Sequence, residues 1–196
     1  MPVIKEKTTN EIYDGIMKLL LEDDPDLLTI TNISKRSGYS IGNIYHYFKN
    51  IDSVLEEFLI NRSNRRTEAM IKLINETPAS ITAIELAKLL NDSNFLFMTK
   101  LPKVMFMKLT RLIIMTRKDA IERLDEGILK LADPIEALIN RNESNTFKKL
   151  KSAEIELSLL MCSSALRKAI IANHKLALTK SHQELSLAVM IALLAK

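Results

Sequence analysis

The sequence predicts an all-α protein made of a small N-terminal unit of three helices and a larger helical body. Apolar residues make up 47% of the 196 residues and recur at helical spacing along most of the chain, enough for a substantial core. Only four Gly and five Pro are present, too few for strands joined by tight turns. All four Tyr precede residue 48 and six of the nine Met follow residue 90, and this shift in composition favours two parts.

The first helix is predicted to begin at residues 8–11, where Thr8, Thr9 and Glu11 have the pattern of a capping box. It should end in the acidic loop at residues 22–25, which closes with a proline. Its inward face is predicted to be one apolar stripe formed by Ile12, Ile16, Leu19 and Leu20.

Two short helices are predicted next, each with a capping residue in front of it. Thr29 can cap the second helix, in which Ile33 faces inward, and Ser40 can cap the third, in which Ile44 and Phe48 face inward. Residues 37–40 form a tight turn between them.

A long fourth helix is predicted from the cap Asn50 to about Asn75, because Pro78 restricts the residue before it to an extended conformation. The remaining sequence reads as further helices. Breaks between them are expected near residues 91–93, Pro102, residues 133–134 and residues 141–145.

Residues 29–48 have the pattern of a helix-turn-helix. Ser34 supplies a small residue where two helices would cross, Gly38 tolerates a positive φ in the turn, and Ile44 can pack back on the first helix. The spacings of four and six residues allow two short helices to meet at a steep angle. In such a motif the second helix lies in the major groove with its N-terminal residues at the base edges.

The same stretch resembles the DNA-binding signature of TetR-family regulators, in TITNIS at residues 29–34 and GYSIGNIYHYFKN at residues 38–50. The similarity runs from about Thr9 to Phe58, and the helical remainder and total length also suit the family. The resemblance implies a DNA-binding domain at residues 1–50 and a ligand-binding and dimerisation domain at residues 51–196, in which residues 51–75 form a connecting helix.

The resemblance also implies roles for individual residues. Asn43 would read a base, since an amide can bond adenine through two hydrogen bonds, while Ile41 would contact a thymine methyl and Gly42 would allow close approach. Tyr45, Tyr47 and Lys49 would bind phosphates. The full set expected at the DNA is Thr29, Ser40, Ile41, Gly42, Asn43, Tyr45, His46, Tyr47 and Lys49.

One position departs from the family pattern. The family usually has a lysine where this chain has Ile51, at the start of the fourth helix. Ile51 either packs inward or marks a lost phosphate contact on an exposed surface. We favour the exposed position, because Val54, Leu55 and Phe58 already supply the inward face.

The C-terminal end is predicted to form the dimer interface. Residues 153–170 carry two apolar stripes, and the final helix is apolar almost all round from Leu185 to Ala195. In the TetR family two such helices from each subunit commonly form a four-helix bundle. The residues expected there are Leu157, Leu159, Leu160, Leu166, Leu185, Val189 and Ala192.

A cluster of Phe and Met in the middle of the body suits an adaptable apolar pocket, and the family resemblance implies an effector site there. Plain core packing is the competing interpretation. The candidate pocket residues are Phe95, Met98, Met105, Phe106, Lys108, Arg111 and Met115, in which the two cations would bind an anionic group if they point inward.

Other classes of function find little support. No catalytic grouping or metal-ligand spacing is present, so we expect neither an enzyme nor a cofactor, and Cys162, the single cysteine, is expected to pack in the core. The apolar run Leu187–Ala195 is too short to cross a membrane, which needs about 20 residues. The start of the chain lacks the pattern of a secretory signal, so we expect a cytoplasmic protein.

The sequence therefore predicts a regulator that binds a palindromic double-stranded DNA operator as a homodimer, most simply a repressor released by a small apolar or amphipathic effector. The alternative is an interaction or ligand-binding protein with a weakened helix-turn-helix. The net charge of +4 does not decide between them, because residues 1–66 carry nine Lys and Arg against ten Asp and Glu.

Overall fold

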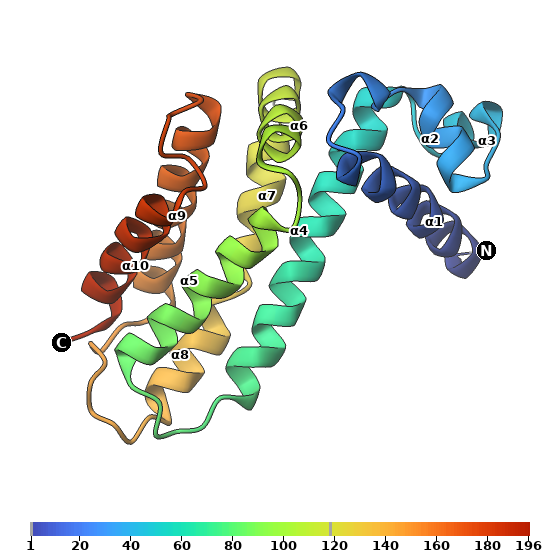
Figure 1. Ribbon diagram of the computed structural model, residues 1–196. Helices are drawn as coiled ribbons and strands as arrows, with labels where there is room; N and C mark the ends of the chain where they lie inside the picture. Colours follow the sequence, from blue (N-terminus) through green and yellow to red (C-terminus); the bar gives the residue numbers. More distant parts are fainter. Residues whose placement is uncertain (1, 118) are drawn as a thin grey trace.

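The computed structural model describes residues 2–117 and 119–196, and within these ranges the chain is helical (Figure 1). The β-pairing recorded there is an isolated bridge between Phe147 and Ala195. The all-α prediction is confirmed. The helices are α1 (Pro2–Leu21), the 3-10 turn η1 (Pro25–Leu27), α2 (Ile30–Ser37), α3 (Ile41–Tyr47), α4 (Ile51–Glu76), α5 (Ala83–Thr99), α6 (Lys103–Thr116), α7 (Ala120–Leu129), α8 (Ala132–Asn140), α9 (Ser152–Ile171) and α10 (Lys180–Leu194).

Helices α1, α2 and α3 form a unit at one end of the molecule (Figure 1). The predicted stripe on α1 is buried and packs with Ile33 of α2 and Ile44 of α3, both fully buried. Gly15 lets α1 approach α2 closely, because a Cβ there would lie 2.9 Å from the backbone nitrogen of Ser37. The three helices therefore share one small core.

The predicted start of the first helix is wrong. Helix α1 begins at Pro2, so Thr8, Thr9 and Glu11 lie inside it and form no capping box. The hydroxyl of Thr9 instead donates to the carbonyl oxygen of Glu6 at 3.0 Å, one turn earlier. Proline suits the first helical position, where its missing N–H has no partner to lose.

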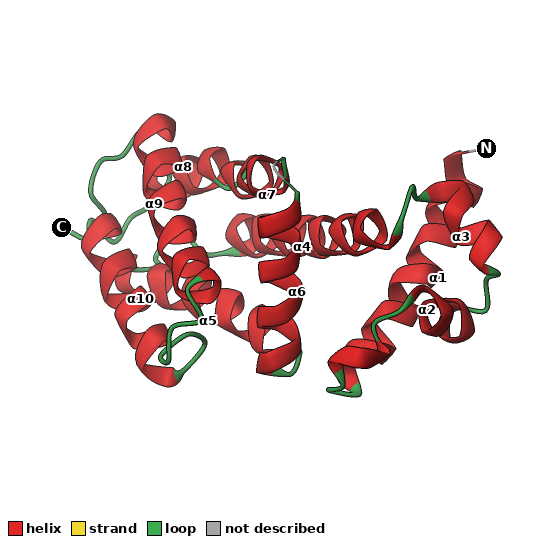
Figure 2. Cartoon of the chain, turned by 90° about the horizontal axis from the view of Figure 1, so that it is seen from above, coloured by secondary structure: helices red, strands yellow, loops and turns green. Residues whose placement is uncertain are grey.

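Helix α4 extends from the N-terminal unit along the body (Figures 1 and 2). As predicted, Asn50 caps it: the Asn50 side chain accepts from the Ser53 backbone N–H, and the Ser53 hydroxyl accepts from that of Asn50. The helix ends at Glu76, just before Thr77 and Pro78. Continuous helix therefore links the N-terminal unit with the interior of the body.

Two of the predicted breaks in the body are misplaced. Helix α5 continues through residues 91–93, because buried Asn91 donates its amide to the carbonyl oxygen of Gln183 on α10 at 3.2 Å. Pro134 lies in the first turn of α8, and the break precedes it at residues 130–131. The breaks at Pro102 and at residues 141–145 are confirmed.

The body packs α5 to α10 around the inner face of α4, with α10 lying along α5 and α9 against α6, α7 and α8 (Figure 2). One buried cluster joins the N-terminal unit to α5 and α6, and a second lies at the far end between α4, α5 and α8. In the described ranges, no helix has the length and apolar character needed to span a membrane.

Candidate functional site

The turn between α2 and α3 has the geometry that the sequence predicts. Thr29 and Ser40 cap the two helices through their hydroxyls, which accept from the backbone N–H groups of Asn32 and Asn43. Gly38 ends α2 with φ of 78°, a left-handed conformation that glycine adopts without strain. The Ser34 hydroxyl donates to the Tyr39 carbonyl oxygen at 2.6 Å and holds the turn.

Helix α3 presents one face to the core and the other to solvent. Ile44 is fully buried, while Ile41 and Tyr45 are 37% and 44% exposed and Asn43 and His46 are also exposed. At Gly42 a Cβ would meet nothing within 4 Å, so the fold does not require glycine there. The outward face is thus available to a partner, and the missing Cβ matters only to something that approaches from outside.

The predicted phosphate-binding residues surround this face in different environments. Lys49 is exposed, whereas Tyr47 is half-buried, packs on the core and stacks edge-on with His46 at 5.2 Å between ring centroids. The hydroxyls of Thr29 and Ser40 are already engaged in capping α2 and α3. A phosphate would therefore be bound there by the helix N-termini and not by these side chains.

Ile51 is half-buried and packs against the core cluster that joins α1, α3 and α4. The expectation of an exposed surface position is therefore wrong, and the inward-packing alternative holds. The physical reason is its place in the fold: Ile51 is the first residue of α4, next to the N-terminal unit, whose core cluster it packs against.

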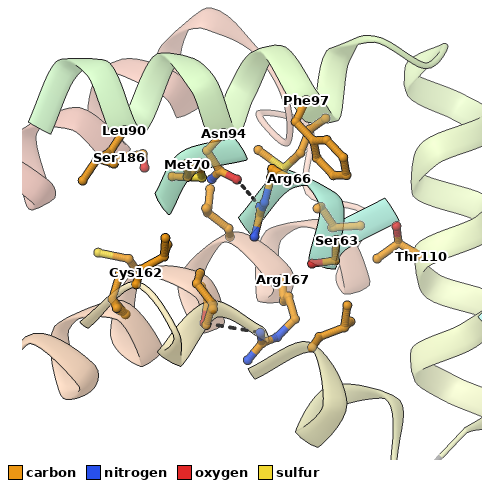
Figure 3. A pocket seen from close by; sticks show the side chains of 18 of the residues that line it. Ser63, Arg66, Met70, Leu90, Asn94, Phe97, Thr110, Cys162, Arg167 and Ser186 are labelled. Carbon is orange, nitrogen blue, oxygen red and sulfur yellow. Dashed lines mark hydrogen bonds between the residues drawn. The ribbon is translucent and has the colours of Figure 1, made fainter. Parts of the chain in front are cut away.

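A cavity of about 130 Å³ lies in the body between α4, α5, α6, α7, α9 and α10. Its lining is mostly apolar, and Figure 3 shows side chains from several of these helices converging on it. Two of the predicted pocket residues, Met98 and Phe106, line it, and so does Cys162. Burial raises the pKa of the Cys162 thiol.

The other predicted pocket residues lie elsewhere. Phe95 and Met105 are 3% and 2% exposed and belong to the packed core beside the cavity. Lys108 is exposed on α6, Met115 is 72% exposed, and half-buried Arg111 does not line the cavity. Helix α6 turns only part of its Met-rich surface inward, so Lys108 and Arg111 do not line this cavity as the sequence suggested.

Sequence reasoning missed the polar residues that do line the cavity. Arg66 of α4 donates to the Asn94 side-chain oxygen at 2.5 Å, and Arg167 of α9 forms a two-pronged pair with Asp125 at 2.6 and 3.1 Å (Figure 3 shows both arginines). Ser63 and Thr110 add hydroxyls. The signal was present on α4, because Arg66 falls in the register of the buried stripe that runs from Leu59 through Ser63 to Met70.

The cavity-lining helices are tied to the start of α4 by charge. Glu56 is 1% exposed and pairs with Arg117 at the end of α6 and with Arg123 of α7 at 3.1 Å. Arg123 also binds Glu57 at 2.7 Å. The adjacent Phe58 packs edge-on against Tyr13 of α1, with ring centroids 5.9 Å apart. One cluster therefore connects α6 and α7 with the N-terminal unit.

Helices α9 and α10 expose an apolar face on the outside of the body. Leu157, Leu185 and Val189 are 60%, 62% and 50% exposed, Met161 is 56% exposed, and Ala192 is exposed too. Four of these exposed residues, all but Met161, were predicted at the interface. Leu160 of α9, also predicted there, is half-buried.

The prediction that Leu159 and Leu166 belong to the dimer interface is wrong, because both line the cavity inside the protomer and do not belong to the outer face. Both stripes on α9 exist, but they face opposite ways: one turns toward the cavity and the other toward solvent. In residues 2–117 and 119–196, no group of three or more His, Cys, Asp or Glu is placed to hold a metal ion.

Comparison with known proteins agrees with this geometry. Residues 12–58 match the family profile described as bacterial regulatory proteins, tetR family. The fold is similar to a TetR transcription regulator from Haloarcula marismortui, with a TM-score of 0.65 and 19% identity over 96% of this chain and 99% of that one.

Two further similar structures are named FadR. The fatty acid degradation regulator FadR from Bacillus halodurans has a TM-score of 0.62 and 17% identity, covering 94% of both chains. The transcriptional regulator FadR from Bacillus subtilis, in complex with stearoyl-CoA, has a TM-score of 0.59 and 17% identity over 93% of this chain and 96% of that one. A search of curated proteins finds no significant match.

Proposed function

We propose that this chain, a DNA-binding transcriptional regulator of the TetR family, is a homodimeric repressor that binds a palindromic operator and is released by a small effector. Residues 1–50 would read DNA, residues 51–196 would hold the effector and the partner subunit, and α4 would connect them. The protein is a regulator and not an enzyme. It would act in the cytoplasm, where its operator lies.

The outward face of α3 carries the DNA-reading part of the proposal. The side chains of Ile41 and Asn43 are exposed and available to a partner. Gly42 between them has no side chain, which leaves room for DNA to approach the helix closely. In the major groove, the Asn43 amide could form hydrogen bonds with a base edge and the Ile41 side chain could contact a thymine methyl group, while Gly42 would let the backbone approach the bases. The capped N-termini of α2 and α3 would receive phosphates on either side.

The apolar face on α9 and α10 supports a dimer. Leu157 of α9 and Leu185 and Val189 of α10 are large apolar side chains that are exposed to solvent and do not line the cavity. A two-fold contact through this face would bury them and pair two α3 helices on a palindromic site.

The cavity supports release by an effector. It is enclosed mainly by apolar side chains and contacts α4, which leads to the DNA-binding unit. A structurally similar regulator, FadR from Bacillus subtilis, was determined in complex with stearoyl-CoA. An apolar or amphipathic effector in this cavity would move α6 and α7, and the Glu56 cluster would pass that motion to α4 and α1.

The test is to select bound sequences from a pool of random duplexes with the full-length protein. We expect an inverted repeat to be enriched, and we expect the complex to contain two subunits per repeat. Recovery of no common sequence, or of a single unrepeated site bound by one subunit, would contradict the proposal. Amphipathic compounds added to the complex then test release.

A further inference from the structure

Arg66 is a charged side chain at the cavity that has no acidic partner among the residues that the structure describes. Its guanidinium donates to the neutral amide oxygen of Asn94 and lies 5.2 Å from the centre of the Phe97 ring. Its Nε is sealed from solvent and has no hydrogen-bond acceptor. Burial, together with the neighbouring positive charge of Arg62, lowers the pKa of Arg66 to about 10.

Arg62, one helical turn earlier, is in the same situation. It donates to the Phe97 carbonyl oxygen at 2.7 Å and to the sulfur of Met17 at 3.4 Å, and it lies over the Phe97 ring at 4.2 Å. Its Nε is also buried without an acceptor. Two like charges therefore sit side by side, partly desolvated, on one face of α4.

Three other arginines of the body have a carboxylate partner, unlike Arg62 and Arg66. Arg117, Arg123 and Arg167 each pair with a carboxylate, and Arg141 donates to three carbonyl oxygens at the end of α4. Over the part of the chain that the structure describes, no carboxylate forms an ion pair with Arg62 or Arg66. Two desolvated cations without a counter-charge raise the free energy of the folded protein, so a bound anion would stabilise them.

Arg62 and Arg66 lie between an open groove and the apolar cavity. Arg66, Met70 and Phe97 line both the cavity and a wider groove of about 480 Å³ between α1, α4 and α5. Arg62, Arg65 and Lys100 line the groove but not the cavity, and Asp14 is the acidic residue in the groove lining, so cations outnumber carboxylates there. The arginines therefore stand where a cationic groove meets an apolar cavity.

We infer that the effector is an amphipathic anion whose carboxylate or phosphate head binds Arg66 and Arg62 and whose apolar chain occupies the cavity. The inference rests on the proposed function and narrows its effector to one chemical class. An arginine fork binds either head through paired, charge-assisted hydrogen bonds. The cavity of about 130 Å³ suits a short chain, since an engineered apolar cavity of ~150 Å³ holds one benzene.

The experiment measures binding of octanoate, octyl phosphate and octan-1-ol to the full-length protein by calorimetry, and release of the selected duplex by each. We expect one or both anions to bind at least ~10-fold more tightly than the alcohol, because hydrogen bonds from an arginine to a charged head are stronger than those to a hydroxyl. Comparison of octanoate with octyl phosphate identifies the head group. Hexanoate and decanoate then report the chain length that the cavity accepts.

Two substitutions on α4 form a matched pair. Arg66→Met removes the cavity charge, and Lys72→Met removes an exposed charge whose pair with Glu76, at 3.8 Å, is solvated. Arg66→Met should abolish the preference for anions and raise the melting temperature of the ligand-free protein, since it removes an uncompensated buried charge. Lys72→Met should keep the preference, and Arg66→Lys should retain part of it.

The outcomes separate this inference from the proposed function. If octan-1-ol binds as tightly as both anions and also releases DNA, the cavity is an effector site but the anion inference is wrong. If an anion binds with an Arg66-dependent preference and leaves DNA binding unchanged, the anion site is confirmed, but the anion is not an effector and release by a ligand at this cavity is wrong. If none of the compounds, including the shorter and longer acids, binds, the inference fails. An anion preference that survives Arg66→Met also overturns it.

Discussion

Glu56 of α4, 1% exposed, is held by an ion pair 3.1 Å long to Arg123 of α7. Arg117, at the end of α6, binds the other carboxylate oxygen of Glu56. The N-terminal part of α4 is thus fixed to the two helices that enclose one side of the cavity. A shift of α6 or α7 must either carry this part of α4 with it or break a buried ion pair.

Glu56→Gln should destabilise the protein by about 1–3 kcal/mol, because Arg117 loses its carboxylate partner, whereas Arg123 keeps Glu57 and both arginines are about a third exposed. Glu57→Gln is the matched control: Glu57 is 40% exposed and its loss should cost less than about 1 kcal/mol. Unfolding in urea, followed by circular dichroism, measures both. Equal midpoints for the two variants would show that the buried pair does not hold α4.

Gly15→Ala should destabilise the N-terminal unit. The new Cβ would lie 2.9 Å from the Ser37 backbone nitrogen, so α1 and α2 must separate, at a cost of about 1–3 kcal/mol that the better helix propensity of alanine only partly offsets. The expected sign is a lower melting temperature. A variant as stable as the parent would mean that the two helices are less closely packed than described.

Gly42→Ala should give the opposite pattern. A Cβ at Gly42 meets nothing within 4 Å, so the fold should tolerate it fully. DNA bound to α3 would meet the added methyl group, and operator affinity should fall while the melting temperature holds. Unchanged affinity in a gel-shift titration would place the DNA away from the N-terminal end of α3.

Asn43→Ala should cost about 1–3 kcal/mol on the selected operator and little on random duplex, since its exposed amide would contact bases and not phosphates. Lys49→Ala is the comparison, because loss of a phosphate contact should weaken both duplexes alike. Binding is measured by fluorescence anisotropy at one fixed salt concentration. Equal losses on both duplexes for Asn43→Ala would exclude base reading by this residue.

Val189→Asp should break the dimer and leave the protomer folded, because Val189 is 50% exposed on the outer face of α10. Leu159→Asp should instead unfold or strongly destabilise the protomer, since Leu159 lines the cavity. Light scattering at low concentration gives the mass, and circular dichroism reports folding. A folded dimer for Val189→Asp would move the interface elsewhere.

The elements predicted well from the sequence depend on contacts a few residues apart. The caps Thr29, Ser40 and Asn50 each bind a backbone N–H three residues later, and Gly38 is needed for its own φ. Such features appear in the local sequence. This is why the turn between α2 and α3, and the start of α4, could be located without a structure.

The features that were missed depend on distant parts of the chain. Asn91 continues α5 because it can bond Gln183, which lies 92 residues later. Met115 looked like a pocket residue from composition, yet the rotation of α6 leaves it 72% exposed. Arg66 became part of the cavity only because α4 turns that face inward. Composition identified the region of the cavity but not which side chains enter it.

The proposed function depends above all on sequence-specific DNA reading by α3. It is tested most directly by the affinities of the full-length protein for the selected palindromic duplex and for a scrambled duplex of the same composition, at one salt concentration. We expect at least ~10³-fold tighter binding to the palindrome, with two subunits per duplex. Equal affinities for the two duplexes, or no measurable binding to either, would contradict it.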